Sequence, residues 1–133
     1  MSDSELFQEA LKARERSYCP YSHFAVGAAL LTEDGEIFHG CNIENAAYGP
    51  TVCAERCAIF SAIARGKRAF TAIAIAGAST DGEVISSAYP CGVCRQVMAE
   101  FCSPKEFQII VGTSPDALEV YRLEELLPHG FHL

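Results

Sequence analysis

Two cysteine motifs, each standing where a loop runs into a predicted helix, constrain the fold of this chain more than any other feature. The first is Cys53 in TVCAERCAIF, and the second is Cys91-x-x-Cys94 in PCGVCRQVMAEF. The C-x-x-C spacing places two thiols on one face of the first helical turn. Free N–H groups and the positive dipole end at a helix start lower thiol pKa values and favour thiolates. A fold in which the two helix starts face each other gathers three thiolates at one point.

Apolar periodicity and turn signals predict one domain, residues 1–133, with helices and strands in alternation. We expect helices at 4–17, 52–65, 90–101 and 123–127, and strands at 25–32, 37–43, 70–77, 107–112 and 118–122. Asp34-Gly35 is a strong hairpin signal between the first two strands. The third strand is apolar on both faces and is expected to be central. The segment from Thr113 to Ala117 is too short for a parallel crossover, so the last two strands should be antiparallel neighbours.

The predicted fold class is therefore α/β, a three-layer α/β/α sandwich with a mixed five-stranded sheet. The formal net charge of −7 and the pI of about 5.0 disfavour a nucleic-acid partner, because binding to phosphates rests on Lys and Arg. The N-terminus shows no signal peptide, and no apolar run approaches the roughly 18 residues of a membrane span. We therefore expect a cytoplasmic protein without a membrane partner. Seven cysteines, an odd number, favour metal binding or catalysis over a complete disulfide framework.

The cysteine motifs predict a catalytic zinc site rather than a structural one. Cys53, Cys91 and Cys94 supply three thiolates and leave the fourth tetrahedral position open, which is typical of catalytic zinc. Glu55 follows Cys53 by two residues and is close enough to reach that open position without binding the metal. A metal that acidifies water and a carboxylate that moves its proton are what a zinc hydrolase needs. The zinc deaminases combine a metal ligand, x-Glu and P-C-x-x-C in this order.

With these motifs, the chain closely resembles the small homotetrameric cytidine deaminases over nearly its whole length. The resemblance rests on YCPYSHFAVGAALLTEDGEIFHGCNIENAAYG, CAER, PCGVCRQV and ELLPHGF. It implies one Zn²⁺ per subunit and hydrolytic deamination of cytidine and 2′-deoxycytidine, with release of ammonia, in pyrimidine salvage. It also implies a homotetramer whose active sites are shared between subunits.

The resemblance also assigns roles to individual residues. Cys53, Cys91 and Cys94 would bind zinc, and Glu55 would be the proton shuttle. The resemblance also implies residues that bind the ribose hydroxyls, pack against the pyrimidine ring or contact the edge of the base, and three residues that reach the active site of a neighbouring subunit. They are Asn42 and Glu44 for the ribose hydroxyls, Phe24 for the pyrimidine ring, Ala54 through its backbone, and Ala46, Tyr48 and Phe131 across the interface.

Arg56 and Cys57 complete the opening stretch. Three thiolates leave the zinc site with a net negative charge, which weakens its power to acidify water. Arg56 is placed to donate hydrogen bonds to the thiolates and offset that charge, as the matching arginine does in the family. Cys57 has no role in the motif and is predicted to be a small core residue.

Three other functions fit parts of the pattern. A zinc-stabilised binding module would want a fourth Cys or His in place of the open position beside Glu55. A deaminase acting on cytosine in RNA or DNA would want a basic stripe with aromatic residues, and the chain has neither that stripe nor a positive net charge. A deaminase of nucleoside-like antibiotics would differ in the ribose segment, where CNIEN favours an ordinary nucleoside.

Overall fold

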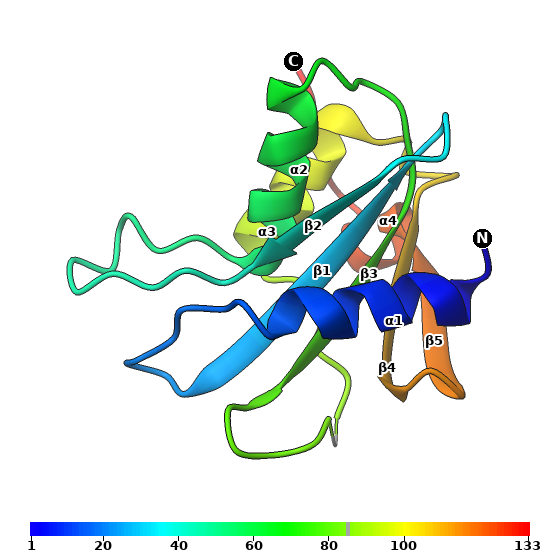
Figure 1. The fold of residues 1–133 in the computed structure, drawn as a ribbon. Helices are drawn as coiled ribbons and strands as arrows, with labels where there is room; N and C mark the ends of the chain where they lie inside the picture. Colours follow the sequence, from blue (N-terminus) through cyan, green and yellow to red (C-terminus); the bar gives the residue numbers. More distant parts are fainter. Residues whose placement is uncertain (85) are drawn as a thin grey trace.

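The computed structural model describes residues 1–84 and 86–133 (Figure 1), so residue 85 of the predicted exposed loop lies outside the described residues. Its helices are α1 (Asp3–Arg14), α2 (Ala54–Ala64), α3 (Gly92–Phe101) and α4 (Leu123–Leu126). Its strands are β1 (Phe24–Thr32), β2 (Ile37–Cys41), β3 (Phe70–Ser79), β4 (Gln108–Ser114) and β5 (Ala117–Arg122). Within the described ranges, no helix is long and apolar enough to cross a membrane.

The five strands form one mixed sheet in the order β2-β1-β3-β4-β5, and β3 is central as its apolar faces predict. β1 is antiparallel to both β2 and β3, whereas β3 and β4 are parallel and are joined through α3. β4 and β5 are antiparallel, as the short connection between them predicts. The β1–β2 hairpin turns at Gly35, whose φ of 89° is a left-handed conformation that glycine adopts readily.

Among the residues that the structure describes, helix α1 alone covers one face of the sheet (Figure 1). Its buried residues Leu6, Phe7 and Ala10 pack on alanines of β1 and β3 and on Ile110 of β4. The helix approaches so closely because Gly27 of β1 lies beneath it. A Cβ on Gly27 would stand 2.1 Å from the carbonyl oxygen of Ala10.

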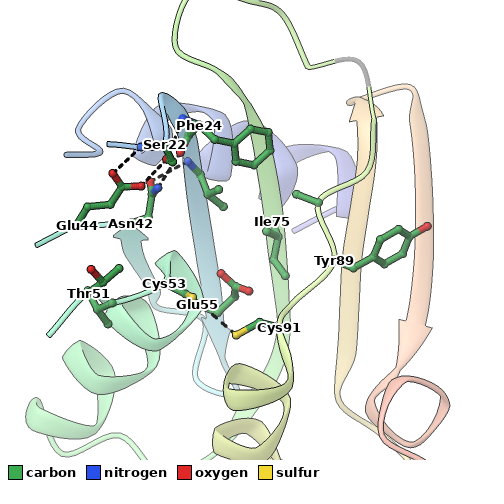
Figure 2. Close-up of a pocket in the computed structure, with 13 residues that line it drawn as sticks. Ser22, Phe24, Asn42, Glu44, Thr51, Cys53, Glu55, Ile75, Tyr89 and Cys91 are labelled. Carbon is green, nitrogen blue, oxygen red and sulfur yellow. Dashed lines mark hydrogen bonds between the residues drawn. The ribbon is translucent and has the colours of Figure 1, made fainter. Parts of the chain in front are cut away.

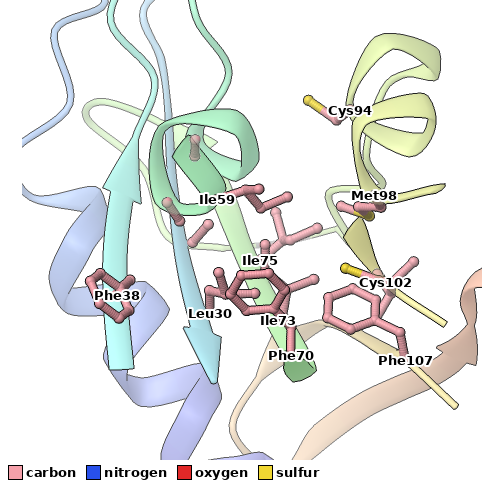
Figure 3. Packing of buried hydrophobic residues seen from close by; sticks show 14 of the residues in the cluster. Leu30, Phe38, Ile59, Phe70, Ile73, Ile75, Cys94, Met98, Cys102 and Phe107 are labelled. Carbon is pink, nitrogen blue, oxygen red and sulfur yellow. The ribbon is translucent and has the colours of Figure 1, made fainter. Parts of the chain in front are cut away.

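Helices α2, α3 and α4 lie against the opposite face, which completes the three layers (Figure 1). Ile59 of α2 and Met98 of α3 pack with Ile73 and Ile75 of β3 in the larger of two buried apolar clusters (Figure 3). Gly40 of β2 lets α2 approach its strand, because a Cβ there would stand 2.3 Å from the carbonyl oxygen of Ala54. The packing therefore fixes the start of α2 against the sheet.

The predicted element boundaries need small corrections. α1 begins at Asp3 rather than Ser4, because Ser2 and Glu5 form a capping box, and it ends at Arg14 rather than near Ser17. The second strand ends at Cys41 rather than Ile43. α2 and α3 begin two residues later than predicted, after Cys53 and Cys91, which are their N-cap residues. The last helix ends at Leu126, one residue early.

Candidate functional site

The N-terminal ends of α2 and α3 meet, and their cysteines form one cluster. Cys53 is the N-cap of α2 and Cys91 is the N-cap of α3, and neither side chain makes a capping hydrogen bond. The Sγ atom of Cys91 lies 3.8 Å from that of Cys53 and 3.6 Å from that of Cys94. All three sulfur atoms lie within 4.8 Å of one another. In residues 1–84 and 86–133 this is the one group of three or more candidate metal ligands.

The cluster fits zinc in both geometry and charge. Thiolates bound to tetrahedral zinc at about 2.3 Å stand roughly 3.8 Å from one another, which matches the separations found here. Without a metal, the thiols of Cys53 and Cys94 compete for a proton. The neighbouring Cys94 thiol and the Arg56 guanidinium lower the pKa of Cys53 to about 5, whereas the pKa of Cys94 is raised, chiefly by Cys53. A bound cation would allow all three to be thiolates, and the three cysteines are placed to hold one.

Glu55 is the buried carboxyl group beside this cluster. It lies in the first turn of α2 with only 4% of its surface exposed, and its side chain faces the same cavity as Cys53 and Cys91 (Figure 2). Burial raises the pKa of Glu55 to about 7. A carboxyl group whose pKa is close to neutral can both accept and return a proton, which suits a general acid–base residue.

Arg56 points from the first turn of α2 to the sulfur atom of Cys53. Its Nη2 atom donates a hydrogen bond of 3.4 Å to Cys53 Sγ, and this contact raises the pKa of the guanidinium further. Its Nε atom is buried without a hydrogen-bond partner among the described residues. Arg56 therefore places positive charge, and unused donor capacity, beside the sulfur cluster.

A cavity of about 290 Å³ opens in front of Glu55 and the cysteines. Several residues predicted as substrate contacts line it. They are Phe24 on β1, and Asn42 and Glu44 in the segment after β2 (Figure 2). The remaining lining residues are Ser22, Val26, Thr51, Val52, Cys53, Glu55, Ile75, Ala88, Tyr89 and Cys91.

Hydrogen bonds hold the polar residues at the mouth of this cavity. The Asn42 side chain accepts from the Val26 N–H at 2.9 Å and donates to the Phe24 carbonyl at 2.8 Å. Glu44 accepts from the backbone N–H groups of Tyr21 and Ser22, at 3.0 Å each, and from the Ser22 hydroxyl. These bonds lower the pKa of Glu44, with the Ser22 hydroxyl contributing most, so it presents a carboxylate.

Four other predicted contact residues do not line the cavity. Ala54 is fully buried directly after Cys53. Ala46 and Tyr48 lie in the loop between β2 and α2, which extends away from the sandwich in Figure 1, and Tyr48 is 78% exposed. Phe131 is also exposed, and Gln96 donates a hydrogen bond to its carbonyl group at 3.1 Å.

The sequence patterns did not identify every residue at the cavity. Thr51, Ile75, Ala88 and Tyr89 line it, yet no motif marked them as site residues. Tyr89 directly precedes Pro90-Cys91, and that position was the available signal. Cys57, predicted to be a core residue, is only half-buried, and its sulfur atom is not one of the three grouped candidate metal ligands.

Comparisons with known proteins agree on one family. Residues 1–111 match the cytidine and deoxycytidylate deaminase zinc-binding region. A cytidine deaminase of Sporosarcina psychrophila is 50% identical over 131 residues, covering 98% of this chain and 92% of the relative. The crystal structure of cytidine deaminase from Burkholderia pseudomallei superposes with a TM-score of 0.89 at 46% identity, covering 98% of this chain and all of that one. Cytidine deaminase from Mycobacterium tuberculosis gives a TM-score of 0.78 at 38% identity, covering 100% and 99% of the two chains.

Proposed function

Because this chain belongs to the cytidine and deoxycytidylate deaminase zinc-binding family, we propose that it deaminates free cytidine and 2′-deoxycytidine to uridine and 2′-deoxyuridine. The resemblance predicted from the sequence motifs is thereby confirmed at the level of the family. One observation carries the proposal further. A buried carboxyl group, Glu55, and two sulfur atoms of a zinc-compatible cluster line the same cavity.

The chemistry divides between the metal and the side chains. Zinc held by Cys53, Cys91 and Cys94 supplies a Lewis acid that makes water a better nucleophile. Glu55 would take one proton from the attacking water and deliver it to the ring nitrogen next to C4. It would then take the second proton from the oxygen now bonded to C4 and deliver it to the amino group, which leaves as ammonia. Its pKa of about 7 suits both transfers near neutral pH. Arg56 donates to Cys53 and offsets the charge of the thiolates.

The cavity supports assignments for the nucleoside itself. Phe24, 40% exposed at the cavity wall, is proposed to pack against the pyrimidine ring. Asn42 and Glu44 are proposed to bind the ribose hydroxyls, because the Glu44 carboxylate and the Asn42 amide lie together at the mouth. The backbone of Ala54 is proposed to contact the base edge. The net charge of −7 favours a free nucleoside over a polynucleotide.

The exposed predicted residues support a shared active site. Ala46, Tyr48 and Phe131 lie outside the cavity of their own subunit, and the loop that carries Ala46 and Tyr48 extends from the body. We propose a homotetramer in which these residues reach a neighbouring cavity. Seven free cysteines fit a reducing compartment, so the proposed role is pyrimidine salvage in the cytoplasm.

The test is a substrate panel with the zinc-loaded protein. Cytidine, deoxycytidine and a cytosine-containing single-stranded DNA oligomer are incubated separately. The first two reactions are followed by ultraviolet absorbance, and the third by uracil excision. Loss of the nucleoside absorbance with an untouched oligomer is expected. Deamination of the oligomer alone would overturn the proposal. Light scattering after size-exclusion chromatography tests the tetramer, and a monomer that is fully active would refute the shared site.

A further inference from the structure

The segment that leads into Cys91 is held by side chains outside the metal cluster. The Tyr89 hydroxyl donates a 2.5 Å hydrogen bond to Glu119 of β5, and Ser87 donates to the same carboxylate oxygen at 3.2 Å. The Tyr89 ring also lies edge-on to Tyr121, with ring centroids 6.0 Å apart. Glu119 and Tyr121 are two positions apart on a strand and therefore share one face of β5.

Tyr89 lines the cavity, but its ring points out of the site (Figure 2). Figure 2 shows its ring pointing away from Glu55 and Cys53, toward the two C-terminal strands. Its neighbour Ala88 also lines the cavity. The ring therefore ties the cavity wall to the far edge of the sheet.

The distance from this tie to the metal ligand is short. Two residues of extended chain span at most about 7 Å, so the Tyr89 backbone lies within that reach of Cys91. Pro90 between them is buried and has a fixed φ, which makes the link stiff. Arg95 holds the same link from the other side, donating 2.7 Å hydrogen bonds to the carbonyl groups of Pro90 and Leu126.

Cys91 depends on this link more than the other two ligands do. Cys94 is completely buried inside α3, and Cys53 receives a hydrogen bond from Arg56. Cys91 is exposed, is an N-cap residue and makes no capping hydrogen bond. Its backbone is held on one side by α3, where the Arg95 N–H donates to the Cys91 carbonyl at 3.0 Å, and on the other side by the residues immediately before it.

We propose that Tyr89 and Glu119 form a positioning pair that holds residues 88–91 against β5 and so fixes the Cys91 thiol at 3.6–3.8 Å from its two partners. The inference rests on the proposed zinc function. It assigns a metal-retaining role to two side chains that do not touch the metal.

The experiment measures how fast the zinc-loaded protein releases its metal to a chromogenic chelator. Tyr89→Phe removes the hydroxyl donor, and Glu119→Gln replaces the charged acceptor by a neutral amide, which accepts a weaker hydrogen bond. Both changes keep size and shape. Tyr89→Phe should speed zinc release about three- to tenfold, the range expected for one hydrogen bond, and Glu119→Gln should speed it by a smaller factor. The double variant should release zinc no faster than Tyr89→Phe, because both changes act on the same contact.

Matched controls separate this role from general stabilisation. Tyr18→Phe changes another exposed tyrosine, and Glu124→Gln changes a carboxylate of the same region that pairs with Arg122. Both controls should release zinc at the wild-type rate, and the metal-free positioning variants should lose no more than a few degrees in unfolding temperature, the effect of one hydrogen bond.

Each outcome has a defined meaning. Unchanged release in Tyr89→Phe and Glu119→Gln, additive effects in the double variant, or equal losses in the controls would overturn the positioning pair. If the variants gave one of those results while the wild-type protein bound zinc and deaminated cytidine, the positioning pair would be wrong and the proposed function would stand. A wild-type protein that binds no zinc would overturn both.

Discussion

Gly40→Ala should damage the active site from a position that contacts no substrate or metal. A Cβ there would stand 2.3 Å from the Ala54 carbonyl oxygen and 2.5 Å from the Ala58 nitrogen, both backbone atoms of α2. Restoring an ordinary contact of at least 3.4 Å requires α2 to move by about 1 Å, the difference between 3.4 and 2.3 Å. Overpacking of this kind costs about 1–3 kcal/mol in the free energy of unfolding. For a domain of this size that loss lowers the unfolding temperature by roughly 3–12 °C.

The same movement reaches the metal cluster. Cys53 and Glu55 flank Ala54 at the start of α2, so a displaced helix changes the 3.8 Å separation of Cys53 Sγ from Cys91 Sγ. Zinc affinity should fall about 10- to 100-fold, the usual effect of disturbing the support of a metal ligand. Calorimetry of the metal-free protein gives the unfolding temperature, and competition with a chelator gives the zinc affinity.

Gly27→Ala is the matched control. Its Cβ would stand 2.1 Å from the Ala10 carbonyl oxygen and 2.3 Å from the Arg14 nitrogen, so it displaces α1 on the opposite face of the sheet. We expect a similar loss of unfolding temperature with zinc affinity retained. If Gly40→Ala left both quantities unchanged, or if Gly27→Ala weakened zinc binding equally, the packing argument would be wrong.

Three further predictions concern individual side chains. Cys91→Ser should lose both zinc and cytidine turnover, measured by metal analysis and absorbance on one preparation, whereas Cys41→Ser should keep both. Burial raises the pKa of Glu55 from 4.5 to about 7, so its contribution to the stability of the metal-free protein is fully present below pH 4.5 and is lost as the pH rises through 7. This contribution is about 3 kcal/mol. Glu55→Gln should abolish this pH dependence, which a comparison of thermal unfolding at pH 5 and pH 8 would show. Burial also raises the pKa of Cys102 to about 12. Iodoacetamide at pH 8 should therefore modify Cys91 of the metal-free protein at least ~10-fold faster than Cys102, as peptide mapping would show. Equal rates of modification would contradict this prediction.

The sequence predicted the architecture well because its signals are local. The Asp34-Gly35 turn, the apolar third strand and the short connection after Gly112 each restrict pairing within a few residues, and the strand order agrees with all three. Helix ends were less accurate. Cysteine is an unusual N-cap residue and makes no capping bond here, so nothing in the local pattern moved the starts of α2 and α3 past Cys53 and Cys91.

The site was predictable where a motif carries the chemistry. The spacing of the three cysteines indicated the cluster, and in the structure the three sulfur atoms lie within 4.8 Å of one another. Three other residues line the cavity because segments far apart in the sequence pack together there: Ile75, Ala88 and Tyr89. The apolar periodicity of a single sequence does not predict which distant segments pack together. The raised pKa of Glu55 likewise follows from its burial, which only the packed structure reveals.

The most direct test of the central claim compares wild-type protein with Glu55→Gln. Both proteins are loaded with zinc, the metal content of each sample is measured, and cytidine turnover is followed by absorbance on the same samples. We predict equal zinc content and a loss of turnover of about 10²–10⁴ in the variant, the range for an acid–base residue. A zinc-replete Glu55→Gln protein that deaminates cytidine at the wild-type rate would contradict the account.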